Sequence, residues 1–483
     1  MKKLQELYEK TQNDVIIKGI KINSKEIEKG DLFVCTMGAT ADRHDFIDEA
    51  IKNGAAAIVV SKDVGEKSVP IIKVPDANRE LPYLCQKFYD YPDQKLKMIG
   101  VTGTDGKTST TTIIQTLIGS DLCGYIGTNG RSCAKFTGDN PNTTPDAQNM
   151  YMYLDAFVGY GCKYASIEAS SEAFFRGRLQ AMQFDVSAMT NVTSEHLNIH
   201  GSFENYLESK LMLFKQTKKD GYTVLNKDDQ YYDKAREACN ADNVLTYGVG
   251  EDNDLQIVNF KLYPNHTDIT FKYKGEEIKV DSPLMGDFNV YNLACAILCT
   301  ICAGFNLDTI LNRIKDIKIS GRLELLNTNT PYFVMVDYAH TPNGIMKLLN
   351  FVHTLDIKRS IVVIGQAGER DYLKRPQVGN VVVDNATYAI FTSEDPRSED
   401  PANICNDIIK ELKETHNNYE IVLDRREAIK KAINMAEAND MVLVLGKGNE
   451  TYEKLKDETI YFNDMEEAYN AVAERELKEK EGK

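Results

Sequence analysis

Near residue 100 the chain holds a glycine-rich loop whose residue types could bind phosphate. A short apolar stretch leads into Gly103 and Gly106, which are followed by Lys107, Thr108 and a run of Ser and Thr. Glycines let the backbone turn tightly and present its N–H groups, the lysine ammonium can reach terminal phosphates, and the threonine hydroxyl can ligate Mg²⁺. The usual P-loop spacing needs glycine where this chain has Val101, so the loop is a variant. We predict ATP or GTP binding; a turn that only caps a helix is the alternative.

Three further residues could surround a metal ion beside this loop. Glu168 ends an apolar segment, and a carboxylate there suits Mg²⁺, which prefers oxygen ligands; a helix N-terminal carboxylate is the alternative. His196 and His200 are four residues apart, as in a zinc pair on one helix face, but Glu195 precedes the first histidine instead of following it. We therefore discount zinc and keep one imidazole as a neighbour of Mg²⁺, with a surface or capping role as the alternative.

Lysine and arginine side chains supply the remaining candidates. On its pattern alone, Lys210 in the segment 206–214 predicts an exposed helix lysine. Two charged, proline-containing turns at residues 368–376 and 393–401 carry several arginines. Arginine binds carboxylates in a bidentate manner, so these turns could hold an acidic or zwitterionic substrate. Surface salt-bridge loops are the alternative interpretation.

Short apolar segments that alternate with helical patterns must position these residues. We predict a helix at 45–51, a buried helix at 293–304, and strands at 31–35, 56–60, 164–167, 184–190, 332–336, 360–364 and 441–445. Such alternation is typical of an α/β fold with a largely parallel sheet covered by helices, and phosphate-binding loops lie at the carboxyl ends of its strands.

The length of 483 residues predicts about three domains, and changes in pattern near residues 95 and 320 separate them. We predict an N-terminal domain at 1–95, a nucleotide-binding domain at 96–320 and a C-terminal domain at 321–483.

Composition excludes several classes of function. The net charge of −15 argues against a broad surface for nucleic acid or anionic membranes. The chain has no stretch of about 18 apolar residues and its N-terminus lacks a signal-peptide core, so we expect a cytoplasmic protein with no membrane insertion. The ten cysteines are scattered, as expected for reduced thiols. One Cys-x-x-Cys occurs, at Cys299 and Cys302, but it lies in the predicted buried helix and no second pair follows, so we discount a metal or redox role.

Many separated motifs together resemble one family. They lie at residues 103–108, 142–147, 168–171, 177–178, 190–191, 195–196, 206–214, 286–292, 321–324, 337–342 and 446–450. Over nearly its whole length the chain resembles the Mur ligases, and within them the MurE type, which adds the third residue of the peptidoglycan stem peptide.

The resemblance implies an ATP-dependent amide ligase of three-domain Mur architecture. The central P-loop-type domain would have a mostly parallel sheet, the N-terminal domain would bind the UDP-MurNAc moiety, and the C-terminal domain would be Rossmann-like. The D-glutamate carboxylate of UDP-MurNAc-L-Ala-D-Glu would attack the γ-phosphate of ATP. The amine of a diamino acid would then displace phosphate from the acyl phosphate through a tetrahedral intermediate.

The resemblance also assigns residues to ATP, metal and catalysis. It implies that Lys107, Lys210 and His340 are catalytic. It implies Mg²⁺ ligation by Thr108, Glu168, His196 and Lys210, the last as a carbamate (N6-carboxylysine) formed with CO₂. The implied ATP-binding residues are Gly103, Thr104, Asp105, Gly106, Lys107, Thr108, Ser109, Asn289, Asn292, Arg322 and Asp337.

For the UDP-MurNAc-dipeptide, the matched positions are Ser24, Thr143, Thr144, Ser170 and Arg178. The chain departs from the family pattern at several places around them. It has Asn-Ser-Lys at 23–25 for Asp-Ser-Arg, Arg43 for the glycine of Asp-Gly-His, and Glu172 for a histidine.

For the third amino acid, the matched positions are Arg370, Glu394, Asp395, Arg397, Gly446 and Glu450. Arg397 favours meso-diaminopimelate, because that diamino acid has a distal carboxylate for it to hold. Asp395 replaces an asparagine, and its negative charge suits the bare ammonium of lysine. We predict diaminopimelate, with an L-lysine-adding enzyme as the alternative.

Two further hypotheses stay open. The first is another amide ligase of the superfamily, such as a folylpolyglutamate, polyglutamate or cyanophycin synthetase. The second is a non-catalytic paralogue that keeps the fold. We expect a monomer.

Overall fold

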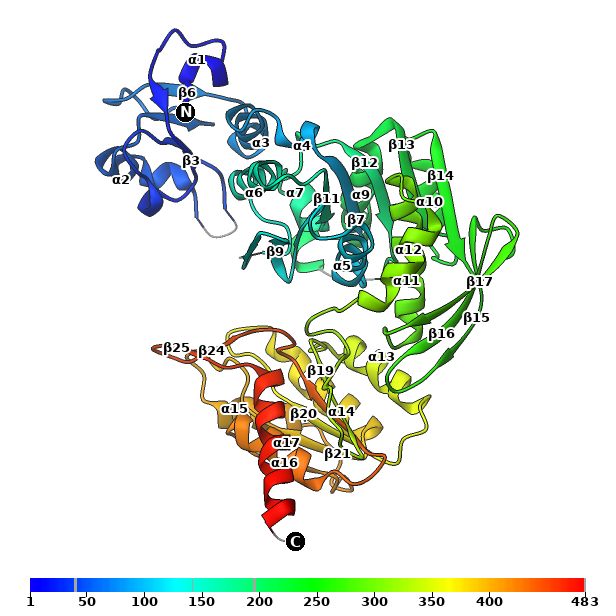
Figure 1. Ribbon diagram of the computed structural model, residues 1–483. Coiled ribbons are helices and arrows are strands. Elements are labelled where there is room, and N and C mark those ends of the chain that lie inside the picture. Colours follow the sequence, from blue (N-terminus) through cyan, green and yellow to red (C-terminus); the bar gives the residue numbers. More distant parts are fainter. Residues whose placement is uncertain (39–40, 141, 194–196, 482–483) are drawn as a thin grey trace. The chain divides into compact units, whose positions relative to one another are not determined.

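The computed structural model describes residues 1–483 except 39–40, 141, 194–196 and 482–483 (Figure 1). The chain packs into two compact units. The first unit comprises Met1–Ile257, Lys272–Glu276 and Tyr291–Arg313, and the second comprises Val258–Phe271, Glu277–Val290 and Ile314–Lys483. This division by packing is coarser than the three predicted domains, whose boundaries stay a prediction.

The N-terminal part of the first unit contains a four-stranded parallel sheet in the order β3-β4-β5-β6. Its strands are β3 (Ile20–Lys21), β4 (Leu32–Val34), β5 (Ala57–Val60) and β6 (Ile71–Lys73), and beside them lie β1 (Lys2–Lys3), α1 (Leu4–Leu7), β2 (Ile16–Ile17), α2 (Ile47–Asn53) and α3 (Ala77–Phe88). The predicted strands are confirmed. The helix prediction was wrong for its first two residues, because the Asp42 carboxylate caps a short 3₁₀ turn at Arg43–Phe46.

An 11-stranded sheet follows in the chain. Its order is β10 (Phe136–Gly138), β9 (Gly130–Cys133), β8 (Cys123–Gly127), β11 (Tyr164–Glu168), β7 (Lys97–Thr102), β12 (Phe184–Met189), β13 (Thr217–Asn226), β14 (Asn243–Gly248), β15 (Leu255–Leu262), β16 (Thr267–Tyr273) and β17 (Glu276–Ser282). The strands from β8 to β15 in this order are parallel, whereas β9 and β10 form antiparallel ribbons. The predicted strands at 164–167 and 184–190 are thus found as β11 and β12.

The register of this sheet decides which side chains meet at one edge. Glu168 of β11 pairs with Val101 of β7, and Met189 of β12 pairs with Thr102. The carboxyl ends of three strands that are distant in sequence therefore lie side by side. The helices of this region are α4 (Pro92–Lys95), α5 (Lys107–Ile118), α6 (Ala147–Tyr160), α7 (Ser171–Phe175), α8 (Leu197–His200), α9 (Phe203–Lys215), α10 (Tyr232–Glu237), α11 (Asp287–Cys302) and α12 (Leu307–Arg313).

The predicted buried helix is α11, whose side chains from Leu293 to Cys299 are buried. All ten cysteines are free thiols. The apolar run around Cys299 and Cys302 is thus explained by core packing.

The second unit is built on a six-stranded sheet in the order β18 (Glu324–Leu325), β19 (Phe333–Asp337), β23 (Met441–Leu445), β20 (Ser360–Ile364), β21 (Tyr388–Phe391) and β22 (Tyr419–Ile421). All strands but β18 are parallel to their neighbours. The predicted strands at 360–364 and 441–445 match β20 and β23. The strand predicted at 332–336 is found one residue later, as β19. The hairpin β24 (Tyr452–Lys454) and β25 (Thr459–Tyr461) lies outside this sheet.

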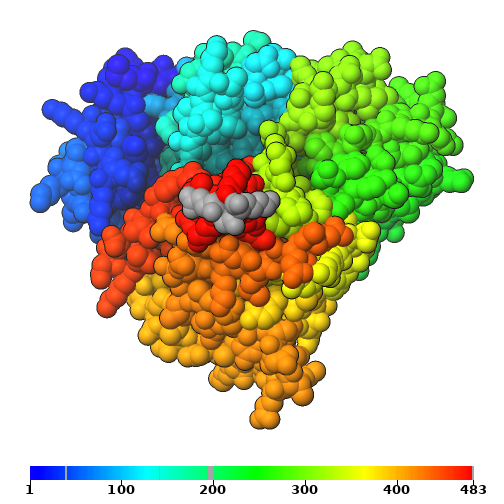
Figure 2. Space-filling view, turned by 60° about the horizontal axis from the view of Figure 1, so that its bottom comes forward, coloured from blue at the N-terminus to red at the C-terminus, as the bar shows by residue number. Residues whose placement is uncertain are grey.

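Helices cover both faces of this sheet and form a separate core on each. One core contains residues of α13 (Pro342–His353), α14 (Arg375–Asn385) and α15 (Pro401–Ile409). The other contains residues of α16 (Arg425–Met435) and α17 (Asp464–Glu481), and residues near the C-terminal end of α17, drawn in red, lie on the surface (Figure 2). Helices on both faces explain why the parallel strands are apolar throughout. No helix among the described residues is long and apolar enough to cross a bilayer.

Candidate active site

The glycine loop joins the end of β7 to the start of α5. Gly106 directly precedes the helix with φ of 82°, and Gly103 has φ of 152°. A Cβ atom at Gly103 would overlap the buried hydroxyl of Thr190. The Thr104 N–H donates to the Asn191 carbonyl oxygen at 2.8 Å, so the segment after β12 holds the loop from one side.

Lys107 lies at the first turn of α5, with its ammonium above the loop. Its Nζ donates to the carbonyl oxygens of Gly103 and Thr104, each at 2.9 Å. This arrangement places a positive charge beside the N-terminus of a helix, where backbone N–H groups already favour anions. The loop therefore has the strand-loop-helix geometry that a phosphate cradle requires.

Glu168 is the fully buried last residue of β11 and lies beside the loop. Its carboxylate accepts hydrogen bonds from Thr108 Oγ1 at 3.0 Å, Tyr125 OH at 2.8 Å, and the N–H and Oγ1 of Thr128 at 2.8 and 3.2 Å. Thr108 and Glu168 together offer hydroxyl and carboxylate oxygens, which is the donor set that Mg²⁺ prefers.

Lys210 corrects the expectation drawn from its pattern alone. The pattern predicted an exposed lysine, but its exposed fraction is 1% because α9 packs this face against β7 and β12. The Nζ atom donates to the Gly103 carbonyl oxygen and lies 4.5 Å from the ring centroid of Tyr206. As an ammonium it cannot ligate a metal, whereas a carbamate on this nitrogen would bring two oxygens that share one negative charge to the loop.

The two histidines have different outcomes. His196, with Glu195, lies outside the described residues. His200 is buried, and its ring contacts Ser171 Oγ at 3.2 Å and Ser209 Oγ at 3.4 Å and packs against the aromatic rings of Phe175 and Tyr206. His200 therefore serves the core.

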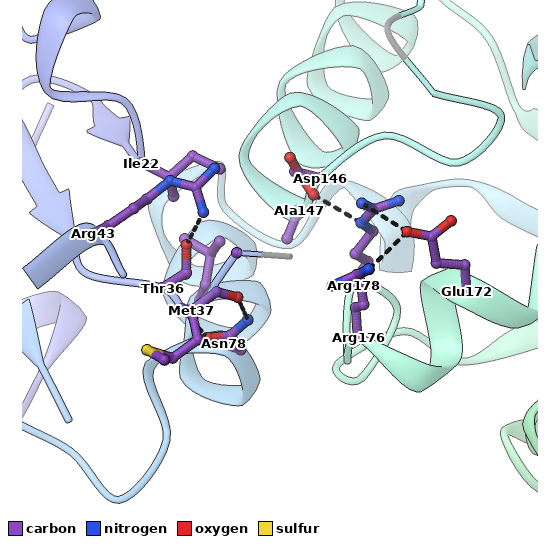
Figure 3. Close-up of a pocket in the computed structure, with 12 residues that line it drawn as sticks. Ile22, Thr36, Met37, Arg43, Asn78, Asp146, Ala147, Glu172, Arg176 and Arg178 are labelled. Atoms are coloured by element: carbon purple, nitrogen blue, oxygen red, sulfur yellow. Dashed lines mark hydrogen bonds and ion pairs between the residues drawn. The ribbon is translucent and has the colours of Figure 1, made fainter. Parts of the chain in front are cut away.

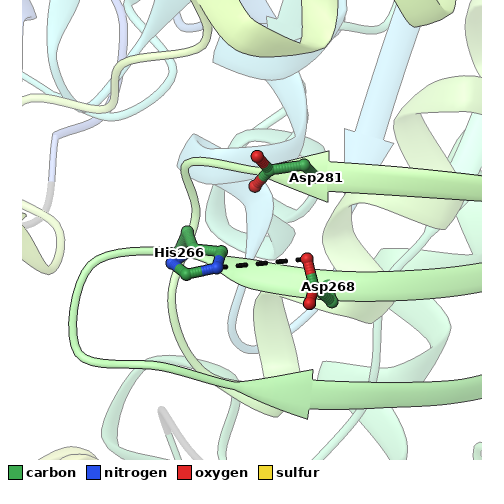
Figure 4. Close-up of side chains that lie close together, drawn as sticks. All are labelled: His266, Asp268 and Asp281. Atoms are coloured by element: carbon green, nitrogen blue, oxygen red, sulfur yellow. Dashed lines mark ion pairs between the residues drawn. The ribbon is translucent and has the colours of Figure 1, made fainter.

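Another group of possible metal ligands occurs in the second unit, at β16 and β17. Within the described chain, His266, Asp268 and Asp281 place their ligand atoms within 4.8 Å of one another (Figure 4). Both aspartates are exposed, and the His266 ring also stacks on Tyr263 and contacts Asn265. Sequence reasoning missed this cluster; the spacing of two between His266 and Asp268, at the start of β16, is its one signal in the sequence.

Four of the five residues assigned to the UDP-MurNAc-dipeptide lie together beside Glu168. The Thr144 Oγ1 lies 2.6 Å from the Glu168 carbonyl oxygen and 2.9 Å from Ser170 Oγ. Arg178 donates to the Thr144 carbonyl oxygen at 3.0 Å, and Thr143 Oγ1 is 3.0 Å from Thr128 Oγ1.

Ser24 lies apart from this group. It begins a 3₁₀ turn, where its hydroxyl donates to the Glu49 carboxylate and its carbonyl oxygen accepts from Asn53. The structure therefore gives Ser24 a local contact instead of a place beside Glu168.

An open pocket with a volume of about 170 Å³ adjoins Arg178 in the first unit (Figure 3). It is lined by Ile22, Thr36, Met37, Gly38, Arg43, Asn78, Leu81, Asp146, Ala147, Glu172, Arg176 and Arg178. Of these, only Arg178 was among the predicted site residues, because no spacing in the sequence brings residues near 40 to residues near 175.

In the second unit, Asp337 and His340 follow β19. The Asp337 carboxylate accepts the N–H groups of Leu323 and Ala339, each at 2.7 Å, and burial raises its pKa. The His340 Nδ1 lies 2.9 Å from the Tyr338 carbonyl oxygen, which places the proton on that nitrogen. Burial lowers the pKa of His340 to about 4, so its imidazole is neutral at pH 7.

The other nucleotide-side candidates occupy both units. In the first unit, Asn292 Oδ1 on α11 lies 3.4 Å from Thr110 Oγ1. A Cβ atom added at Gly106 would overlap the Asn292 side chain. In the second, the Asn289 amide donates to the Met285 carbonyl oxygen, and the Arg322 guanidinium lies 4.7 Å from the Tyr338 ring centroid.

Most residues assigned to the third amino acid surround Lys447 in the second unit. The Lys447 Nζ donates to Asp395 Oδ1 at 2.8 Å and to Glu450 Oε2 at 3.0 Å. The Lys454 N–H donates to Asp395 as well, at 3.1 Å, and the Arg397 N–H donates to the Lys454 carbonyl oxygen. The added negative charge of Asp395 therefore has a cationic partner within the protein, which it shares with Glu450.

Glu394 is the other acidic group of this cluster. Burial raises its pKa to about 7, against the opposing effect of Arg425 and Lys447. Among the described residues, its Oε2 atom has no hydrogen-bond donor, and a Cβ at Gly446 would overlap it. Arg370, in contrast, is exposed.

Family models match three consecutive parts of the chain. They are the Mur ligase family catalytic domain at residues 16–98, the Mur ligase middle domain at 101–300 and the Mur ligase glutamate ligase domain at 321–448. A protein of Clostridium perfringens is 36% identical over 466 residues, which covers 94% of this chain and 95% of that protein. The chain belongs to the Mur ligase family.

Further similarities agree with this assignment. A protein of Fusobacterium nucleatum is 37% identical over 468 residues, 95% of each chain, and both it and the clostridial protein are named UDP-N-acetylmuramoyl-L-alanyl-D-glutamate–2,6-diaminopimelate ligase. A solved structure under the same name has a TM-score of 0.71 at 28% identity and covers 98% of this chain and 99% of its own. MurF from Thermotoga maritima, solved with ADP, has a TM-score of 0.66 at 19% identity, covering 97% of this chain and 100% of its own, and shares the fold.

The predicted Mur ligase architecture, with a mostly parallel central sheet and an α/β C-terminal part, is thereby confirmed. The chain is an ATP-dependent ligase.

Proposed function

We propose that this ligase adds 2,6-diaminopimelate to UDP-N-acetylmuramoyl-L-alanyl-D-glutamate, with ATP as co-substrate, in the synthesis of peptidoglycan precursors. The observation that carries the proposal is the 36% identity, over 94% of the chain, to a ligase of that name. The cluster of Lys107, Thr108, Glu168 and Lys210 at the end of β7 and β11 supplies matching chemistry.

The reaction needs positioning and charge neutralisation more than a protein nucleophile. The substrate carboxylate would attack the γ-phosphorus of ATP, breaking its bond to the oxygen of ADP, and the amine would then displace phosphate. Lys107 would neutralise charge on the transferred phosphoryl group, while the loop N–H groups orient the phosphates. Thr108 and Glu168 would hold Mg²⁺, which neutralises phosphate charge when bound.

Lys210 fits a carbamate role within this proposal. Its neutral amine would attack CO₂, forming an N–C bond and releasing the amine proton, and the product would be an anionic metal ligand. Its burial against Gly103 and Tyr206 supports a defined position for such a group. His196, outside the described residues, stays a proposed ligand by resemblance.

Arg397 and Asp395 bear on the identity of the third amino acid. Asp395 was the reason to consider lysine, since its charge suits an ammonium. That charge already pairs with Lys447, which is fully buried. Arg397 then stays as the group that would hold the distal carboxylate of diaminopimelate, which supports a diaminopimelate-adding enzyme over a lysine-adding one.

The decisive experiment combines purified protein with ATP, Mg²⁺, UDP-MurNAc-L-Ala-D-Glu and either meso-diaminopimelate or lysine. We expect phosphate release and a UDP-MurNAc-tripeptide with diaminopimelate only. If phosphate were released with lysine but not with diaminopimelate, lysine would replace diaminopimelate as the proposed third amino acid. If no phosphate were released with either amino acid, the ligase proposal would be refuted.

The carbamate is tested by Lys210→Ala. We expect almost no activity in bicarbonate buffer and partial recovery with a short added carboxylate. The matched control is Lys215→Ala on the same helix, an exposed lysine paired with Glu208, which should keep full activity. Full activity of Lys210→Ala would remove the carbamate role.

The substrates also suggest where the reaction occurs. ATP and UDP-linked sugars are cytoplasmic metabolites, so we expect the enzyme to act in the cytoplasm. The monomeric state stays a prediction.

A further inference from the structure

We propose that Arg43 binds the diphosphate group of the nucleotide substrate, an inference that rests on the proposed function. Arg43 lies on the wall of the open pocket that carries Thr36 and Asn78, and Arg176 and Arg178 lie on the facing wall (Figure 3). The assignment follows from the charges that line this pocket and from its position relative to Glu168.

The charges of the facing wall are matched by neighbouring carboxylates. Arg178 pairs with Asp146 at 2.7 Å, and Arg176 pairs with Glu172 at 2.6 Å. Glu172 also lies 3.9 Å from Arg178. These four side chains form an ionic network in which each guanidinium has a carboxylate partner.

Arg43 has no such partner in the described part of the chain. Its Nη1 donates to Thr36 Oγ1 at 2.8 Å, which fixes the guanidinium at the pocket wall without neutralising it. The neighbouring carboxylate in the sequence, that of Asp42, instead pairs with the Lys62 ammonium and contacts the His44 ring. The pocket therefore carries an excess positive charge that comes from Arg43, in a chain of net charge −15.

An anion of the right geometry would satisfy this charge, because a guanidinium binds phosphate oxygens through its planar donors. The order of groups along the substrate decides which anion this is. The reacting D-glutamyl carboxylate must come to the glycine loop and Glu168. Arg178 marks the end of the pocket near that position, because it is bonded to Thr144 and Thr144 contacts Glu168. Arg43, on the other wall, would meet a part of the substrate farther from the reacting end, where the diphosphate is the anionic group.

Calorimetric titration with UDP and with uridine tests the assignment on the full-length protein. For Arg43→Ala we expect about tenfold weaker UDP binding, as the loss of one charge-assisted contact implies, and unchanged binding of uridine. Arg43→Lys should fall between the wild type and Arg43→Ala. The affinity of the wild type for UDP should fall more with added salt than that of Arg43→Ala.

The matched control is Arg236→Ala. It removes the same charge from an exposed position on α10, outside the pocket, and should leave UDP binding unchanged. In the ligase assay, Arg43→Ala should raise the KM for the UDP-MurNAc-dipeptide about tenfold, with kcat and the KM for ATP unchanged.

Each outcome decides something specific. Equal UDP affinity in Arg43→Ala and wild type overturns the proposal, as does wild-type protein that does not bind UDP. If Arg43→Ala raised the KM for the dipeptide substrate without changing UDP affinity, Arg43 would contact a peptide carboxylate instead of the diphosphate. That result would also overturn the proposal. Wild type that binds UDP through Arg43 but forms no tripeptide would refute the proposed reaction and leave this assignment standing.

Discussion

Arg397, the residue proposed to hold the distal carboxylate of diaminopimelate, has an unusual backbone conformation. Its φ is 53°, in the left-handed region that costs about 1 kcal/mol or more for a residue with a Cβ atom. Arg397→Gly removes the guanidinium and this strain together. We expect at least about a 100-fold loss of kcat/KM for diaminopimelate, since an unpaired buried carboxylate costs about 3–5 kcal/mol, with little change in Tm. The measurement is steady-state kinetics with diaminopimelate and lysine, plus a thermal melt.

Arg397→Lys is the control, because it keeps the charge without the planar donors and should lose less. If Arg397→Gly lost activity only in proportion to a lower Tm, the recognition role would be refuted.

Glu394 should make stability depend on pH. Its folded pKa of about 7 lies above the ordinary value of 4.5, because the carboxyl is buried. The folded state therefore keeps the proton where the unfolded state loses it, so this contribution is complete below pH 4.5 and is lost as the pH rises through 7. We expect Glu394→Gln to be about 1–3 kcal/mol more stable than the wild type at pH 8 and nearly equal at pH 4.5.

Urea unfolding at a series of pH values measures this difference. Glu411→Gln, at an exposed position of the same unit, should follow the wild type at every pH. A difference between Glu394→Gln and wild type that stays constant from pH 4.5 to 8 would contradict the assignment.

At the residue scale, the sequence predicted side chains that belong to a continuous motif and missed partners brought in by folding. Lys107, Thr108 and Glu168 could be proposed as one site from the sequence because a loop and a strand end are local signals, and the structure places Thr108 in contact with Glu168; their roles stay predictions. Lys447 was missed as the partner of Asp395, since they lie 52 residues apart on different strand ends. Local spacing likewise predicted an exposed Lys210, because the packing of α9 on the sheet leaves no mark in so short a segment.

At the scale of elements, the loop between β7 and α5 should tolerate no side chain at Gly103. A methyl group there would meet the buried Thr190 hydroxyl and lie close to the Asn191 carbonyl oxygen. We expect Gly103→Ala to weaken ATP binding at least about tenfold, since the added Cβ would overlap Thr190 Oγ1 and the loop would have to leave the geometry proposed to bind phosphate. Calorimetric titration with ATP measures the change.

Gly159→Ala is the matched control. Gly159 lies in α6 with nothing within 4 Å of an added Cβ, so alanine should raise stability by about 0.5–1 kcal/mol and leave ATP binding unchanged. Normal ATP affinity in Gly103→Ala would show that the loop is more adaptable than its contacts indicate.

Strands were the elements predicted best, because buried parallel strands are short apolar runs between polar turns. The order of the strands within the sheet could not be predicted from the sequence. β7 pairs with β11 and β12 instead of the next strand in the chain, β8, and such pairing depends on long crossovers whose lengths do not specify a neighbour. The 3₁₀ turn before α2 was missed because a capping aspartate changes the geometry of only a few residues.

At the scale of the whole molecule, two compact units with separate cores should unfold in separate steps. The fully buried pair Arg425–Asp464 lies within the second unit, with hydrogen bonds of 2.7 and 2.6 Å. Removing one partner of a buried pair costs about 3–5 kcal/mol. We expect Asp464→Asn to lower only the transition of the second unit, by about 10 °C.

Calorimetry gives the transitions, and hydrogen exchange read by mass spectrometry assigns each to its unit. Lys358→Ala removes one member of an exposed pair with Glu437 and should change neither transition by more than about 1 kcal/mol. A single transition that shifts as a whole in Asp464→Asn would show that the units unfold together.

The contacts of the glycine loop also affect when the protein can bind nucleotide during its synthesis on the ribosome. The groups that hold the loop come from Thr190, Asn191 and Lys210, 85 to 107 residues later in the chain. While the loop itself emerges early in translation, it has none of these contacts until β12 and α9 have been made. A nascent chain should therefore acquire affinity for nucleotide abruptly and late, once the ribosome has passed α9 and the crossovers around β7 have closed.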